Sequence, residues 1–168
     1  MWLEMRGTKG RVAILMGSER DLDFCQEIGK YLQRLKVNYE FRVCSAHKTP
    51  EKVLKTLKEY EDECVVFVTV AGRSNALSAF VDANTKRPVI ACPLYSEKYG
   101  GVDVFSSLRV PSGVASLVTL EPEGAALAAA KILALENRDF EKTIGEYQHA
   151  KKREIEQADV AVKKLKQC

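Results

Sequence analysis

Short apolar runs alternate along the chain with longer stretches in which apolar residues recur every three or four positions. The runs are rich in valine and other strand-forming residues and span 12–16, 39–44, 65–70, 89–92 and, more weakly, 114–120. Between the first two runs, Leu22, Cys25, Leu32 and Leu35 follow helical spacing, and residues 53–60 repeat this pattern. The alternation predicts five strands separated by helices.

Strands that alternate with helices favour a parallel sheet covered on both faces. Because crossovers between parallel strands are right-handed, we predict an α/β, flavodoxin-like three-layer sandwich of about five strands in the order 2-1-3-4-5. The switch point then lies between the first and third strands, and ligands are expected at the carboxyl ends there. The loops concerned are residues 17–21, 45–48 and 71–75.

The second half of the chain predicts two helices and one long loop. Residues 93–112 are irregular and too long for an ordinary connection, which indicates a functional loop or a subunit contact. An alanine-rich helix is expected at 122–135 and a last, protruding helix at about 139–166. The last helix has a narrow apolar stripe: Ile144, Tyr147, Ile155, Ala158, Val162 and Leu165. So polar a helix favours packing across a subunit boundary, with docking on its own domain as the alternative.

Length and charge limit the organisation further. At 168 residues, 46% of them hydrophobic, the chain is long enough for one α/β domain and too short for two. We predict a single domain over 1–168 with its core at about 12–135. Residues 151–168 hold six Lys/Arg against three acids, so they account for the net charge of +3 and the remainder is neutral. A basic stretch on one terminal helix is weak support for nucleic-acid binding, and none is expected.

The cysteines and the hydropathy suggest a cytoplasmic protein. The five cysteines form an odd set without CxxC spacing, which favours reduced core residues: Cys25, Cys44, Cys64, Cys92 and Cys168. Residues 1–11 contain no apolar segment typical of a signal peptide, and nowhere are there 18 consecutive apolar residues. No cluster of histidines or paired acids stands at metal-ligand spacing, so no metal site is expected.

Candidate chemistry centres on His47, one of two histidines, within the segment SAHKTP at 45–50. An imidazole beside a hydroxyl, a cation and a helix N-terminus is typical of a proton-transfer group next to an anion site. The alternative is a partly buried structural histidine. Lys48 is either a phosphate ligand or one more surface lysine. Thr49 and Pro50 are interpreted as a helix N-cap and its first residue.

The loop after the first strand also allows two interpretations. Ser18 and Asp21 have the spacing of a helix capping box, which is a structural role. Gly17, however, lets a ligand approach the backbone next to a helix N-terminus, and such a position favours a phosphate.

The loop after the third strand contains the segment RSN at 73–75, just before an apolar stretch. Ser74 or Asn75 is therefore expected to be a helix N-cap. In the functional interpretation, the backbone N–H groups of residues 72–75 hold a developing carboxylate.

Five segments together resemble the aminoimidazole ribonucleotide (AIR) carboxylase family of purine biosynthesis. They are MGSxxD at 16–21, SAHKTP at 45–50, AGRSNAL at 71–77, PVIACP at 88–93 and SSLRxPSG at 106–113. They occur in the family's order and at compatible spacings, and the match runs from about 12 to 135. The chain departs from the pattern at Leu94, where many relatives have a second proline after Pro93.

The resemblance is to class II of the family, the form that animals fuse to another purine enzyme. Class I carries a second histidine after the third strand, in a loop like GGAAHLPG, whereas this chain has GRSNAL at 72–77. Class I enzymes move a carboxyl group within N5-carboxyaminoimidazole ribonucleotide, and class II enzymes join free CO2 to AIR. The resemblance therefore implies reversible carboxylation of AIR at C4, giving 4-carboxy-5-aminoimidazole ribonucleotide (CAIR), by a lyase without ATP, biotin or other cofactor.

The resemblance also implies roles for individual residues. His47 would be the catalytic acid/base, and the substrate would be bound by Ser18, Asp21, Ser45, Lys48, Gly72 and Ser74. A candidate CO2 pocket comprises Gly72, Arg73, Ser74 and Asn75. The family further implies a homo-octamer whose active sites are lined by more than one subunit, with the terminal helix reaching a neighbour.

Three alternatives stay open. The nearest is the class I mutase activity. A phospho-acceptor receiver domain requires acids after the first and third strands, where this chain has MGS and VAG. An FMN carrier requires a hydroxyl-rich phosphate loop and flanking aromatics, yet the single tryptophan is Trp2.

Overall fold

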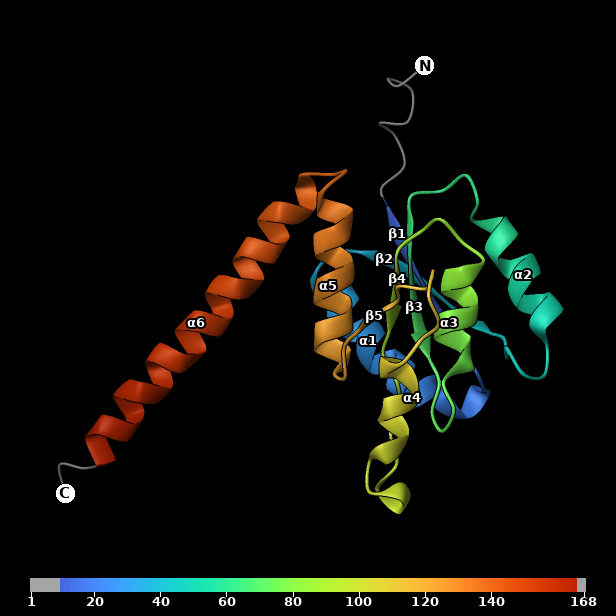
Figure 1. The fold of residues 1–168 in the computed structure, drawn as a ribbon. Helices are drawn as coiled ribbons and strands as arrows, with labels where there is room; N and C mark the ends of the chain where they lie inside the picture. The colour runs from blue at the N-terminus through green and yellow to red at the C-terminus, as the bar shows by residue number, and fades with distance from the viewer. Residues whose placement is uncertain (1–9, 166–168) are drawn as a thin grey trace.

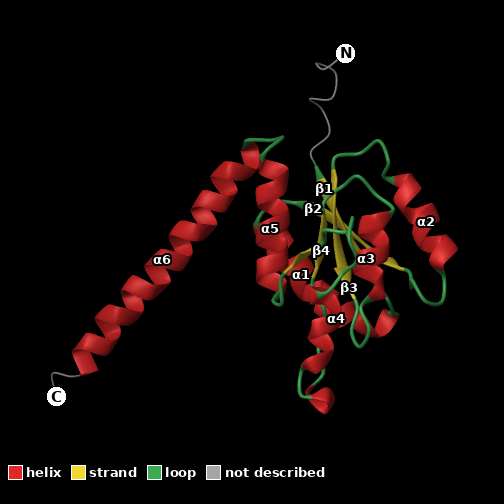
Figure 2. Ribbon diagram, in the orientation of Figure 1, coloured by secondary structure: helices red, strands yellow, loops and turns green. Residues whose placement is uncertain are grey.

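Five parallel strands form the centre of the computed structural model, which describes residues 10–165 (Figures 1 and 2). They are β1 (Arg11–Met16), β2 (Asn38–Val43), β3 (Val65–Val70), β4 (Val89–Ala91) and β5 (Leu117–Val118). The α-helices are α1 (Leu22–Arg34), α2 (Pro50–Glu59), α3 (Ala76–Ala83), α4 (Phe105–Leu108), α5 (Pro122–Ala134) and α6 (Asp139–Leu165). The strand order β2-β1-β3-β4-β5 confirms the predicted doubly wound, flavodoxin-like topology.

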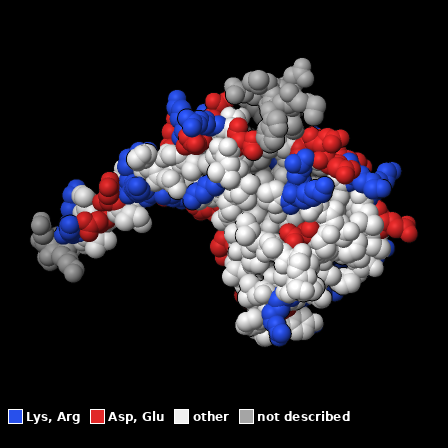
Figure 3. Space-filling model, turned by 45° about the horizontal axis from the view of Figure 1, so that its top comes forward, with Lys and Arg blue, Asp and Glu red and all other residues white. Residues whose placement is uncertain are grey.

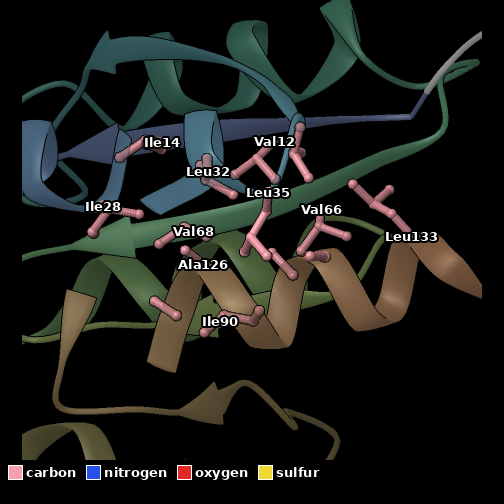
Figure 4. Close-up of a cluster of buried hydrophobic side chains, with 14 of the residues drawn as sticks. Val12, Ile14, Ile28, Leu32, Leu35, Val66, Val68, Ile90, Ala126 and Leu133 are labelled. Carbon is pink, nitrogen blue, oxygen red and sulfur yellow. The ribbon is translucent and has the colours of Figure 1, made fainter. Parts of the chain in front are cut away.

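The core lies in two layers, one on each face of the sheet. Along β1, Val12, Ile14 and Met16 pack with α1 and α5, whereas Ala13 and Leu15 pack with α2 and α3. Successive side chains alternate because the side-chain period of a strand is two. Figure 4 shows the layer that α1 and α5 cover. Both faces of β1 and β3 are buried, which explains why these strands are continuously apolar in sequence.

The last strand, β5, is shorter than the strand that the apolar pattern at 114–120 predicts. β5 is an edge strand that pairs only with β4, and Leu117 is about half exposed. Residues 93–112 are irregular, as expected, but contain α4 and two 3-10 turns at Glu97–Tyr99 and Val102–Val104.

The helix α6 projects from the body of the molecule (Figure 1). Only its first part is docked: Phe140 and Ile144 are buried, and the Tyr147 hydroxyl donates to Glu123 on α5 at 2.7 Å. Every residue from 151 to 165 is exposed. Figure 3 shows basic and acidic side chains together along this projecting part. The predicted helix end at Lys166 lies outside the described residues.

Across residues 10–165, no helix combines the length and the apolar character that a membrane span requires.

Candidate active site

Three loops at the carboxyl ends of β1, β2 and β3 enclose a cleft of about 450 Å³. It lies at the switch point between β1 and β3, the position that the predicted strand order favours. Its lining comes from the three loops and the first turn of α3: Gly17, Ser18, Arg20, Asp21, Ser45, Ala46, His47, Lys48, Ala71, Gly72, Arg73, Ser74 and Leu77.

The loop after β1 brings Ser18 and Asp21 to the cleft. Ser18 is the N-cap of a 3-10 turn at Glu19–Asp21, and its Oγ accepts from the Arg20 amide at 3.3 Å. Ser18 Oγ pairs with the Arg20 amide and not with that of Asp21, whose amide donates to the Ser18 carbonyl at 3.1 Å, so the capping pair is present in altered form. The Ser18 oxygen serves as an acceptor here, which leaves the hydroxyl proton to donate to a ligand.

The loop after β2 is a closed turn that presents His47 and Lys48. The Thr49 amide donates to the Ser45 carbonyl at 2.8 Å, and the Lys48 amide donates to Ser45 Oγ at 3.2 Å. Thr49 is the N-cap of α2 and Pro50 its first residue, as predicted. The Thr49 hydroxyl, however, bonds back to the Ser45 backbone instead of capping the helix. His47 is exposed, so a ligand in the cleft can reach its ring nitrogens.

The loop after β3 contributes backbone and a cation. Gly72 forms an isolated parallel bridge with Leu94, and a Cβ on Gly72 would lie 3.0 Å from the Leu94 carbonyl oxygen. A side chain at this position would press against the Leu94 backbone, so the close approach favours glycine. Arg73 adopts a left-handed backbone with φ of 62°, which is uncommon for residues other than glycine.

Asn75 does not line the cleft, although the sequence placed it in the candidate CO2 pocket. It is 4% exposed and caps α3, because its side-chain oxygen accepts from the Ser78 amide at 3.2 Å. The Asn75 amide donates to Ser106 Oγ at 3.0 Å, so that N–H group is already paired. Of the four residues expected to form the CO2 pocket, Gly72, Arg73 and Ser74 line the cleft.

The lining is electropositive. Arg20, Lys48 and Arg73 bring three side-chain cations to the cleft, against the single carboxylate of Asp21. Burial raises the pKa of Asp21 above its ordinary value, and the nearby Ser18 backbone and the Arg73 charge offset this only in part. Cations and hydroxyls together favour an anion such as a phosphate.

None of the four cysteines within residues 10–165 lines the cleft. Cys25, Cys44 and Cys92 are buried and unpaired, as expected, and Cys64 is partly exposed. Burial raises the pKa of Cys25 and of Cys92 to about 12, so both are thiols at neutral pH. Cys168 lies outside the described residues.

A larger cavity of about 760 Å³ lies between the C-terminal ends of α2 and α3. These ends lead into the amino ends of β3 and β4. The cavity is thus at the edge of the sheet opposite to the one where ligands of such folds bind. No group of three or more potential metal-ligating side chains lies together within residues 10–165.

Two features of the site were missed from the sequence. Arg20 lines the cleft, but it is an exposed arginine next to Asp21 and carries no periodic signal. Ser106 and Ser107 bind the loop after β3 from about 30 residues away. Their only sequence signal is the family-like segment at 106–113.

The doubly wound sheet defines a flavodoxin-like α/β protein, and the cleft at its switch point is lined by cations and hydroxyls beside an accessible imidazole. Residues 11–154 match the family described as AIR carboxylase, and the chain belongs to this family.

Relatives of known structure and name are similar over most of the chain. The phosphoribosylaminoimidazole carboxylase of Archaeoglobus fulgidus is 56% identical over 154 residues, which cover 92% of this chain and 86% of that protein. The crystal structure of Treponema denticola PurE has a TM-score of 0.87 at 42% identity and covers 90% of this chain and 97% of that one. The bifunctional phosphoribosylaminoimidazole carboxylase/phosphoribosylaminoimidazole succinocarboxamide synthetase of Homo sapiens is 46% identical over 76% of this chain, which corresponds to 30% of the human protein.

Proposed function

We propose that this protein carboxylates AIR at C4 with free CO2 to give CAIR in purine biosynthesis, reversibly and without ATP or biotin. The observation that carries the proposal is the position of His47. It is exposed on a cleft lined by hydroxyls and cations at the switch point of the sheet, in a chain of the AIR carboxylase family.

The substrate phosphate binds to Ser18, Ser45 and Lys48. Both serine oxygens accept backbone hydrogen bonds, which fixes the hydroxyls and leaves their protons for phosphate oxygens. Arg20 adds a further charge at the same cleft. The Asp21 carboxylate accepts hydrogen bonds from ribose hydroxyls, and binding energy far from C4 orients the ring.

Carboxylation itself needs little covalent help from the protein. The aminoimidazole ring is an enamine, so C4 attacks the carbon of CO2 and a carbon–carbon bond forms. The backbone at Gly72 and Ser74 and the charge of Arg73 stabilise the developing carboxylate. His47 then removes the C4 proton as a neutral imidazole and restores the aromatic ring. In the reverse direction, His47 protonates C4 before CO2 leaves.

The loop after β3 favours CO2 over the N-carboxylated substrate. Class I enzymes, which move a carboxyl group within the N-carboxylated substrate, carry a histidine in the loop after the third strand. Residues 72–77 contain no histidine. This supports direct carboxylation, and the mutase activity becomes one outcome of the test.

We also propose that the active enzyme is a homo-oligomer, an octamer by the family resemblance. Support comes from α6, whose residues 151–165 are exposed in the single chain. Three apolar side chains of its stripe are more than half exposed: Ile155, Val162 and Leu165. An apolar stripe of this kind on a projecting helix favours contact with a second copy.

The test is ultraviolet-monitored turnover of AIR with bicarbonate-derived CO2 and no ATP, beside turnover of N5-carboxyaminoimidazole ribonucleotide. The wild type is expected to consume AIR in proportion to CO2. His47→Asn should still bind AIR but lose about 10²- to 10⁴-fold in kcat, the usual contribution of a general acid/base. The matched control is His149→Asn, which changes the other histidine on the exposed surface of α6.

Either of two results would contradict the proposal. Turnover of the N-carboxylated substrate alone would make the protein a mutase. A near-normal rate for His47→Asn would remove the role assigned to the imidazole.

A further inference from the structure

We propose that Ser106 and Ser107 are positioning residues of the carboxylation, because their hydroxyls hold the cleft loop at residues 72–75 in place. The inference rests on the proposed function and adds residues that do not touch the substrate. Both serines come from α4, at the end of the irregular segment that follows β4.

Ser106 binds the loop on both sides of Ser74. Its Oγ accepts from the Asn75 amide at 3.0 Å and lies 3.2 Å from the Arg73 carbonyl oxygen. The same oxygen is 2.8 Å from the Asp103 carbonyl oxygen. The single hydroxyl proton therefore serves these two carbonyls, while the oxygen holds the Asn75 amide.

Ser107 binds the loop through a buried side chain. The Asn75 side-chain N–H donates to Ser107 Oγ at 2.9 Å, and the two residues are 4% and 3% exposed. Water does not replace a lost partner at such a buried position, so the pair fixes the Asn75 side chain strongly. The other end of this side chain caps α3 through Ser78.

The position of these bonds explains how Arg73 keeps its backbone conformation. A left-handed φ of 62° is unfavourable for arginine and persists only where the surroundings impose it. Ser106 pairs with Arg73 and Asn75, and Leu94 pairs with Gly72. The segment after β4 thus holds both ends of the loop that is proposed to face CO2.

The serines should affect CO2 much more than AIR. The proposed phosphate ligands lie on the loops after β1 and β2, and neither serine makes a hydrogen bond to those loops among residues 10–165. A displaced loop 72–75 changes the place where CO2 is held and leaves the phosphate site intact.

The experiment measures kcat and the two KM values, for AIR and for CO2, in four variants of the full chain. Ser106→Ala and Ser107→Ala are expected to lower kcat/KM for CO2 about tenfold to a hundredfold, the cost of a small misplacement, with little change in KM for AIR. Ser106→Thr keeps the hydroxyl and should restore most of the rate. Ser96→Ala is the control, because it removes a hydroxyl of the same segment that bonds only to the nearby Lys98 amide.

Amide hydrogen exchange gives a second measurement that needs no substrate. In Ser106→Ala the Asn75 amide should exchange roughly fivefold to tenfold faster, the factor that corresponds to one ordinary hydrogen bond. Amides of β3 should keep their protection, which separates a loosened loop from a destabilised fold.

Unchanged kinetics in both alanine variants would overturn the proposal. Equal losses of kcat/KM for AIR and for CO2, together with faster amide exchange in β3, would also overturn it, since that pattern indicates general destabilisation. If the wild type uses only the N-carboxylated substrate, the proposed function fails, yet the exchange at Asn75 and the rescue by threonine still test the positioning role.

Discussion

Asp21 is the only carboxylate in the lining of the cleft, and its ionised form is unfavourable in the folded protein. Its pKa is raised, chiefly because burial removes water from the charged form. The ionised group therefore destabilises the native state at every pH above its native pKa. Below the ordinary value of 3.8 both the folded and the unfolded forms are protonated, and this penalty disappears.

We expect Asp21→Asn to stabilise the free protein and to impair substrate binding. The amide keeps the shape and an acceptor oxygen but has no charge to desolvate. The melting temperature should rise at pH 7, and the difference from the wild type should shrink as the pH falls toward 3.8. Losing a charged acceptor for the ribose hydroxyls should raise KM for AIR roughly tenfold.

Calorimetry at pH 7 and near pH 4.5 tests the stability part, with Asp23→Asn as control. Asp23 is an exposed carboxylate in the first turn of α1, where a negative charge is favourable, so its substitution should not raise the melting temperature. A melting temperature for Asp21→Asn at or below that of the wild type at pH 7 would show that the charge is not costly.

At the scale of single elements, α1 ends in a recognisable motif with an unusual residue. The Lys36 amide donates to the Gln33 carbonyl at 3.0 Å, and the Val37 amide donates to the Leu32 carbonyl at 2.9 Å. This is the Schellman arrangement, which places Lys36 in the left-handed region at φ of 57°. Glycine is the residue that this position favours.

Lys36→Gly should therefore stabilise the protein by about 0.5–1 kcal/mol. The left-handed backbone costs residues other than glycine about 1–2 kcal/mol, and the greater conformational freedom of glycine in the unfolded chain cancels part of the gain. Urea unfolding measures the gain. Lys55→Gly is the matched control with the opposite sign, since Lys55 is exposed inside α2 and glycine there costs about 1 kcal/mol. Destabilisation by both variants would show that the motif does not strain Lys36.

The elements that the sequence predicted best are those with the strongest local pattern. The run at 65–70 coincides with β3, because burial on both faces makes every residue apolar. The run at 114–120 overestimated β5, where an exposed edge leaves only two paired residues. The loops after β1, β2 and β3 meet at the cleft because the strand order brings the carboxyl ends of these strands together.

The parts of the site that the sequence did not predict depend on contacts between distant segments. The bond between Asn75 and Ser106 joins residues that are 31 positions apart. No periodicity or capping rule connects a loop with a short helix across such a distance. The capping rule did predict an N-cap at Ser74 or Asn75. It did not predict that Asn75 is turned to α4, where it bonds Ser106 and Ser107.

At the scale of the whole molecule, α6 divides into a docked and an exposed part. Ile144 is buried against the domain, whereas Ile155 is 73% exposed although both belong to one apolar stripe. Docking on its own domain describes the first part of this helix, and packing of the rest across a subunit boundary stays a prediction. Its first three turns dock on their own domain, and the remainder has no partner within residues 10–165.

The exposed part of α6 permits a test of the proposed assembly with two nearly identical substitutions. Val162 lies on the stripe. Because successive residues of a helix are about 100° apart, Val160 lies on the opposite side. The two side chains are 56% and 52% exposed, respectively. In an oligomer that buries the stripe, Val162→Glu places an unpaired charge in an apolar contact and should shift the sedimenting species to a smaller mass. Val160→Glu should leave the mass unchanged.

The similar exposure of the two valines makes the comparison independent of the stability of the single chain. Neither side chain contributes to the core, so both variants should melt like the wild type when they are monomeric. Analytical ultracentrifugation over a range of concentrations then reports on association alone. Dissociation by both glutamates, or by neither, would mean that the stripe at Ile155 and Val162 is not the contact surface, and the assembly would have to use another part of the molecule.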